Sequence, residues 1–199
     1  MAAKRKKKRR TPGQKKQGGV TIRRDGAAPH LALRNNFVHV FVDDQNLFWG
    51  IVNDRYGPEF RVDFGRLLLE AAKGPDGIAR GVASAYIAGV IPDEDSFWQI
   101  AKDRGFTVRR GFLGKNNRSK QDDAYLITDM TRTLYKQEGP STIVLFADDA
   151  DYVPPLEAAL EEGWRTEIAF IDRGVSVALE PRIHEFRLVS PIFIEHIRG

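Results

Sequence analysis

"STIVLFADDADYVPPLEAAL", residues 141–160, joins an apolar β-type run directly to a helix-like segment. Three aspartates lie at the junction, because Asp148, Asp149 and Asp151 fall within four positions. Carboxylates this close repel one another and raise one another's pKa unless a cation or hydrogen bonds compensate. A strand that ends in such a cluster and continues at once into a helix indicates a functional site at the junction.

The chain around this stretch alternates between strand-like and helix-like segments. Such alternation predicts an α/β fold with a mostly parallel central sheet and helices on both faces. In such sheets, ligand sites form beyond the carboxyl ends of the strands, near the point where the strand order reverses. The expected strands are 37–42, 81–90, 106–114, 142–147, 165–171 and 187–193, and the expected helices are 46–56, 63–73, 92–105, 121–139, 153–163 and 176–186, the last strained or split by Pro181.

Charge is distributed unevenly along the chain. The net charge is +4, yet residues 1–25 hold eleven Lys and Arg against one acid, so the remainder carries −6. We therefore predict a basic, disordered arm over 1–35 and one domain over 36–199. The length of the chain and its hydrophobic content of 42% suit a single core. Dense basic charge favours nucleic-acid binding, because each neutralised phosphate releases counterions. A sorting signal or a plain solvated tail is the alternative. The densest part of the arm is Lys6, Lys7, Lys8, Arg9 and Arg10.

Several classes of protein are disfavoured by what the sequence lacks. There is no cysteine, which excludes disulfides and Cys-ligated zinc or iron. There is no secretory signal, and no apolar run reaches the roughly 20 residues of a membrane span. We expect a cytoplasmic protein without membrane contact, although "KRKKKRR" (4–10) would serve as a nuclear address in a nucleated cell. The phosphate-binding motifs GxxxxGK[ST] and GxGxxG and the nucleophile motif GxSxG are also absent.

Eight of the sixteen aspartates fall in three short stretches. Two of the stretches follow predicted strands and the third begins a predicted helix. On that helix, Asp123 shares a stripe with Ile127, Met130 and Leu134, so it is a better pocket candidate than Asp122 on the neighbouring stripe. Helix capping alone would explain one aspartate per helix, but not such clusters. The three stretches are Asp43 and Asp44; Asp122, Asp123 and Asp129; and Asp148, Asp149 and Asp151.

Clustered carboxylates without Cys or grouped His suit a hard cation, Mg²⁺ or Mn²⁺. Such a cation relieves the repulsion, activates a water molecule and stabilises charge at a phosphorus centre. The pattern therefore predicts metal-dependent hydrolysis. A basic loop directly before the acidic helix could guide a polyanionic strand across the site, the alternative being a flexible solvated loop. Its cations are Arg109, Arg110, Lys115, Arg118 and Lys120.

Three motifs carry a resemblance to a known family. "VFVDDQN" (40–46), "KQDDAYLITD" (120–129) and "VLFADDADYVPPL" (144–156) resemble the NYN domain, the LabA-like branch of the PIN-like ribonuclease superfamily. Two departures from the family pattern stand in these motifs: Asp44 replaces a usual glycine, and Ala147-Asp148 replaces Ser-Gly. The positions that match the family's motifs are Asp43, Asn46, Lys120, Asp123, Asp129, Asp149 and Asp151, with Tyr152 in place of Phe.

The resemblance implies a Rossmann-like, three-layer α/β/α sandwich that cleaves RNA with a divalent metal. Asn46 is expected to orient the substrate or a water molecule. Two alternatives stay open: a catalytically inactive protein that binds RNA or assembles with a ribonucleoprotein, and a small-molecule phosphohydrolase. A homodimer is a further expectation. The expected metal ligands are Asp43, Asp123, Asp149 and Asp151, and the expected supporting residues are Asp129, Asp148, Asp44 and Lys120.

Overall fold

The computed structural model describes residues 22–23, 36–53, 60–90, 96–113, 119–137, 139–171, 175–189 and 194–196. The arm cations Lys6 to Arg10 and the loop cations Lys115 and Arg118 lie outside these ranges. Within the arm, β1 (Ile22–Arg23) pairs antiparallel with a strand of the main sheet. The predicted division into an arm over 1–35 and a domain over 36–199 remains a prediction.

The main sheet has the strand order β1-β9-β8-β7-β2-β4-β5-β6. The six strands from β9 to β5 are all parallel, and the two outermost strands pair antiparallel. This arrangement confirms the predicted α/β fold with a mostly parallel sheet. The strands are β2 (Phe37–Asp43), β4 (Gly81–Val90), β5 (Thr107–Leu113), β6 (Ser119–Lys120), β7 (Thr142–Phe146), β8 (Arg165–Phe170) and β9 (Glu185–Leu188), with β3 (Phe60–Val62) and β10 (Ile194–His196) in a separate two-stranded sheet.

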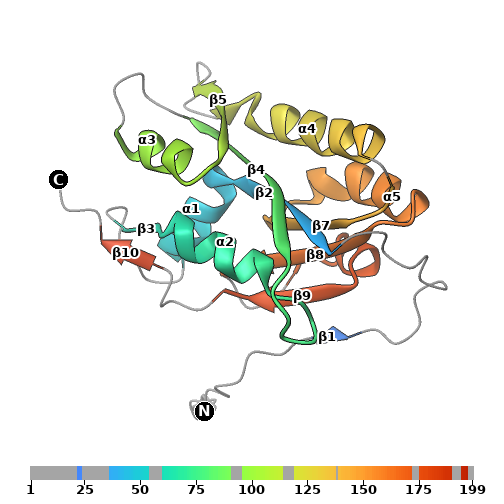
Figure 1. Cartoon of the computed structure of the whole chain (residues 1–199). Helices are drawn as coiled ribbons and strands as arrows, with labels where there is room; N and C mark the ends of the chain where they lie inside the picture. Colours follow the sequence, from blue (N-terminus) through green and yellow to red (C-terminus); the bar gives the residue numbers. More distant parts are fainter. Residues whose placement is uncertain are drawn as a thin grey trace, which may run out of the picture.

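Helices cover both faces of the sheet, which gives three layers (Figure 1). The helices α1 (Asp44–Asn53), α2 (Phe64–Ala72) and α3 (Ser96–Asp103) lie on one face. The helices α4 (Asp122–Lys136) and α5 (Val153–Glu161) lie on the other, and the short 3₁₀ helix η1 (Ala150–Tyr152) leads into α5. The predicted α/β/α sandwich is therefore confirmed.

The central strands are apolar because both of their faces are covered. Every residue of β7 is buried, as is every residue of β2 after Phe37, so neither strand alternates between polar and apolar positions. The sequence also determines where α2 begins. The side chain of Asp63 caps this helix by accepting hydrogen bonds from the backbone N–H groups of Gly65 and Arg66. These buried strands place their last residues, and the aspartates that follow, at fixed positions along one edge of the sheet.

One predicted helix is wrong. Residues 176–186 form a short 3₁₀ helix, η2 (Glu180–Arg182), and then enter β9, which pairs parallel with β8. The pairing buries Phe186 opposite Ile168, and it brings Glu185 to Arg165, whose Nη2 donates to the Glu185 carboxylate at 2.8 Å. These long-range contacts outweigh the local helical pattern, which Pro181 already weakened.

A buried ionic network lies at the amino ends of β8 and β9, at the edge opposite the acidic junctions. Glu167 is fully buried and accepts both Nη groups of Arg80 at 2.8 Å, Nε of Arg165 at 2.6 Å, and a hydrogen bond from Arg187. Burial alone would raise the pKa of Glu167, but the hydrogen bonds and charges of the arginines outweigh it and lower the pKa. Arg80 also donates to the carbonyl oxygens of Ala71 and Lys73, so the network ties the end of α2 to the sheet.

Candidate metal centre

The acidic junctions lie where the strand order reverses. The strands β2 and β7 are parallel neighbours at the middle of the sheet, and the chain builds β4 and β5 on one side of them and β8 and β9 on the other. Asp43 ends β2, and Asp148 and Asp149 follow β7. This is the position at which doubly wound sheets form their ligand sites.

Three carboxylates meet at this position. Asp43, Asp122 and Asp123 each offer an oxygen atom, and the three atoms lie within 4.8 Å of one another. Asp43 comes from the end of β2, while Asp122 and Asp123 occupy the first turn of α4. Oxygen atoms at this spacing can share one hard cation, so the donor set fits Mg²⁺ or Mn²⁺.

Asp122 belongs to this group, although its sequence position favoured Asp123 alone. Asp122 is only 2% exposed and lies on the buried face of α4 with Leu126 and Met130, whereas Asp123 is half-buried at the edge of that face. The missed signal is the first turn itself. Side chains there tilt back toward the helix start, so two consecutive acids can both reach the end of β2.

Asp43 is held from two sides. The backbone N–H of Asn46 donates to Oδ1 and the hydroxyl of Tyr152 donates to Oδ2, each at 2.9 Å. Burial raises the pKa of Asp43 to about 7; the hydrogen bond from Asn46 opposes the rise, and the negative charge of Asp123 adds to it. A carboxylate kept this far from water among like charges gains most when a cation arrives.

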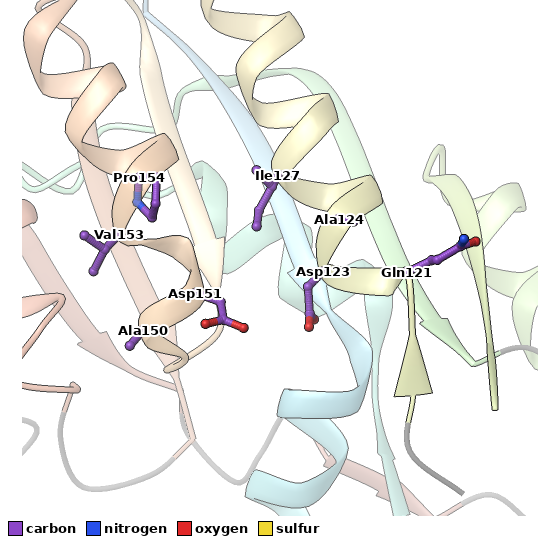
Figure 2. Close-up of a pocket in the computed structure, with 8 residues that line it drawn as sticks. All are labelled: Gln121, Asp123, Ala124, Ile127, Ala150, Asp151, Val153 and Pro154. Carbon is purple, nitrogen blue, oxygen red and sulfur yellow. The ribbon is translucent and has the colours of Figure 1, made fainter. Parts of the chain in front are cut away.

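Asp149 and Asp151 lie near the three clustered carboxylates, and their negative charges affect Asp123. Burial raises the pKa of Asp123, and the charges of Asp122, Asp149 and Asp151 raise it further, while a hydrogen bond with Asp43 opposes them. Asp149 also caps η1, because its Oδ1 accepts the backbone N–H of Asp151 at 3.0 Å. Figure 2 shows Asp123 and Asp151 on opposite walls of a pocket. The structure thus brings all four predicted metal ligands to one region, with Asp43 and Asp123 in the tight group.

Asn46 and Asp148 connect the loop after β7 to its surroundings. The side-chain oxygen of Asn46 accepts the backbone N–H of Asp148 at 2.9 Å. The carboxylate of Asp148 in turn accepts the backbone N–H of Ser176, in the segment before η2. The two side chains therefore hold the rim of the site, and the predicted contact of Asn46 with the substrate remains a prediction.

Asp44, the residue that departs from the family's glycine, lies outside the tight group. It is 8% exposed at the start of α1 and packs against β4. A Cβ atom added to Gly89 would lie only 2.9 Å from the Cβ atom of Asp44. Gly89 therefore makes room for the added side chain. The extra carboxylate is accommodated by the fold instead of crowding the three clustered acids.

Arg109, one of the predicted RNA-binding cations, pairs with an acid of α4. Its guanidinium donates to both oxygens of the buried Asp129, with Nε to Oδ2 at 2.6 Å and Nη2 to Oδ1 at 2.9 Å. The hydrogen bond to Asp129 raises the pKa of Arg109. This pair ties β5 to α4 and so supports the helix that carries Asp122 and Asp123. Arg110 is exposed on β5, and for Lys120 the structure describes only the backbone, in β6.

Tyr152 is expected to strengthen cation binding by holding Asp43. Tyr152→Phe keeps the volume of a fully buried side chain but removes the hydroxyl that orients Oδ2. Partners of metal ligands typically contribute ten- to a hundredfold to metal affinity, so we expect the Mn²⁺ dissociation constant, measured by isothermal titration calorimetry, to rise by about tenfold. Tyr135→Phe, at an exposed position of α4, is the control. Equal Mn²⁺ affinity in both variants would contradict the role.

Comparison with known proteins shows the family. The model of the NYN domain family matches residues 37–187. The crystal structure of a protein of unknown function from Vibrio parahaemolyticus RIMD 2210633 shares the fold with a TM-score of 0.64 and 16% sequence identity, over 85% of this chain and 100% of that chain. No curated protein matches the chain significantly. In the described residues, no helix combines the length and apolar character needed to cross a membrane. The chain belongs to the NYN domain family, which lies within the PIN-like nuclease superfamily.

Proposed function

We propose that this protein is a ribonuclease that hydrolyses RNA phosphodiester bonds with Mg²⁺ or Mn²⁺. The observation that carries the proposal is the group of three carboxylates, Asp43, Asp122 and Asp123, at the switch point of a NYN-family sheet. Structural acids are usually neutralised by arginine, as Glu167 is. In the clustered group, burial and neighbouring negative charges raise the pKa values of Asp43 and Asp123, as expected of a cation site.

Asp43, Asp122 and Asp123 would hold the cation, with Asp149 and Asp151 supplying further carboxylates from the opposite wall. A divalent cation bound there would offset the repulsion, activate water and stabilise charge on the scissile phosphate. The protein's own part is positional: Asn46 and Tyr152 hold the Asp43 carboxylate, and the pair of Arg109 and Asp129 holds α4. The phosphates of the bound RNA would be contacted by Arg110, Lys115, Arg118 and Lys120.

The test is cleavage of an end-labelled single-stranded RNA by the purified full-length chain. We expect cleavage in Mn²⁺, its loss in excess EDTA and its return when Mn²⁺ is added back, because the carboxylates alone repel phosphate. A simple phosphate ester should not be hydrolysed, which distinguishes this function from a small-molecule phosphohydrolase. Full cleavage in EDTA, or none with any divalent cation, would refute the proposal.

Stabilisation of the protein by Mn²⁺ is expected to grow as the pH rises. Because burial raises the pKa of Asp43 from 3.8 to about 7, the metal-free folded protein retains a proton that the unfolded chain loses at lower pH. The stability contributed by that proton is complete below pH 3.8 and is lost as the pH rises through 7. A cation replaces the proton, so the increase in Tm caused by Mn²⁺ should be larger at about pH 8 than at about pH 5.5.

Differential scanning fluorimetry with and without Mn²⁺ measures this difference. Asp43→Asn is the matched control, because its amide does not ionise between these pH values and is a weaker ligand for the cation. The variant should show a small Mn²⁺ effect at both pH values. A Tm increase in the wild type that is independent of pH would contradict the proposed competition between proton and cation.

An RNA-binding or assembly protein without cleavage is the second candidate, and the eleven Lys and Arg in residues 1–25 favour it. Deletion of residues 1–30 separates the two. A nuclease should keep its turnover on short oligonucleotides while RNA affinity and its salt dependence fall. A protein that only binds should lose its measurable RNA contact altogether.

A further inference from the structure

A pocket lies beside the carboxylate group, between the start of α4 and the start of α5 (Figure 2). Its volume is about 760 Å³, within the usual range for small-molecule sites. The acids occupy one part of it, with Asp123 on one wall and Asp151 on the other. The lining residues are Gln121, Asp123, Ala124, Ile127, Ala150, Asp151, Val153 and Pro154.

Most of the wall is apolar. Ala124 and Ile127 line the pocket from α4, and Ala150, Val153 and Pro154 line it from η1 and α5. Pro154 and Pro155 stand in the first turn of α5 and have no N–H, so this helix start lacks donors that would otherwise bind an anion. No Lys or Arg is among the described residues that line the pocket. This part of the pocket therefore suits a neutral group that is at least partly apolar.

The pocket and the carboxylate group share Asp123. A phosphate drawn to a cation at the group would thus have its own nucleoside directly beside the apolar walls. A nucleobase is the neutral, flat part of that nucleoside. The open gap between two helices admits it only if the base is unpaired. The charge of Asp123 and Asp151 repels a second phosphate from the pocket, which leaves the base as the part that enters.

We propose that this pocket is a base-binding subsite, which takes the nucleobase next to the scissile phosphate between Ile127 on one wall and Val153 and Pro154 on the other. The subsite rests on the proposed ribonuclease function and deepens it, because it assigns RNA recognition to the face formed by α4 and α5. Contact with aliphatic walls is tolerant of base identity, so the subsite selects for the presence of a base more than for its type.

An abasic scan tests the subsite. A set of oligouridylates, each with a single abasic residue at a different position, is cleaved by the full-length protein in Mn²⁺. We expect the abasic residue next to the cleaved bond to lower kcat/KM by about tenfold, and one placed four or more nucleotides away to change it by less than about twofold. A flat profile across all positions would overturn the subsite while leaving the nuclease function intact.

Two filled-pocket variants supply the matched comparison. Ala124→Trp and Ala150→Trp would each place an indole in the pocket, from opposite walls and at exposed positions. Both should lower kcat/KM on ordinary RNA by about tenfold and should abolish the effect of the abasic residue, because the base no longer enters. Thr131→Trp, two turns further along α4 and outside the pocket, should behave like wild type.

Equilibrium binding keeps the subsite testable if the chain cleaves no RNA. Fluorescence anisotropy with the same oligouridylates would then measure affinity in Mn²⁺, where an abasic residue at the bound position should weaken binding to the wild type but not to Ala124→Trp. If no RNA is cleaved but this difference in binding is observed, the nuclease function is refuted and the subsite is supported. Identical affinities for the intact and abasic RNAs in both proteins would refute the subsite.

Discussion

Replacement of Asp123 by Asn is expected to reduce Mn²⁺-dependent RNA cleavage by at least about a hundredfold without lowering the stability of the metal-free protein. The amide keeps the size of the side chain but removes one of the three carboxylates whose oxygen atoms lie within 4.8 Å of one another. The cation loses a ligand, while the negative charge that helps to raise the pKa of Asp43 also disappears. Cleavage should therefore fall while the stability of the metal-free protein is kept or increased.

Single-turnover cleavage in Mn²⁺ and Tm in EDTA measure the two effects. We expect the Tm in EDTA to equal or exceed that of the wild type, since a buried like-charge repulsion has been relieved. Asp103→Asn, at an exposed position of α3, is the matched control and should change neither quantity. Undiminished cleavage would remove Asp123 from the mechanism, and a lower Tm in EDTA would assign it a structural role instead.

Replacement of Glu167 by Ala is expected to destabilise the fold by about 3–5 kcal/mol. Glu167 is fully buried and accepts hydrogen bonds from Arg80, Arg165 and Arg187, so its loss leaves three guanidinium groups without their shared acceptor. Breaking one side of a buried ionic network is far more destabilising than replacing the whole network with apolar residues. The free energy of unfolding in urea measures the effect.

The control for Glu167 is Glu157→Ala, which removes the partner of Arg182 in a partly exposed pair and should change the free energy of unfolding by about 0–1 kcal/mol. The pH dependence provides a second check. Because the arginines lower the pKa of Glu167, its stabilising contribution is present above its ordinary value of 4.5 and is lost as the pH falls below it. The wild type and Glu167→Ala should therefore approach each other in stability under acid conditions. A difference below about 1 kcal/mol at neutral pH would contradict the proposed role.

The sheet and the convergence of the acids could be predicted because both follow from local patterns. Buried parallel strands such as β2 and β7 are uninterrupted apolar runs, which are visible without knowledge of their neighbours. Parallel strands also share one carboxyl edge, so Asp43 and Asp149 were expected to meet despite their separation in sequence. The cap Asp63 is recognisable because its partners are the next residues of the chain.

The features that escaped prediction depend on partners far away in sequence. The hydroxyl of Tyr152 reaches Asp43 across 109 residues, and no pattern around either residue indicates that contact. The helical periodicity of 176–186 gave way to strand pairing because β8 offered an edge and Arg165 offered Glu185 a partner. Asp122 was ranked below Asp123 because a helical stripe describes the middle of a helix better than its first turn.

The contact between Tyr152 and Asp43 also has a consequence for protein synthesis. The strand β2 and the first turn of α4 leave the ribosome before Tyr152 does, so the hydroxyl that orients the Asp43 carboxylate is the last of these parts to arrive. A fragment released by a premature stop before residue 152 therefore lacks the hydrogen bond that orients the Asp43 carboxylate.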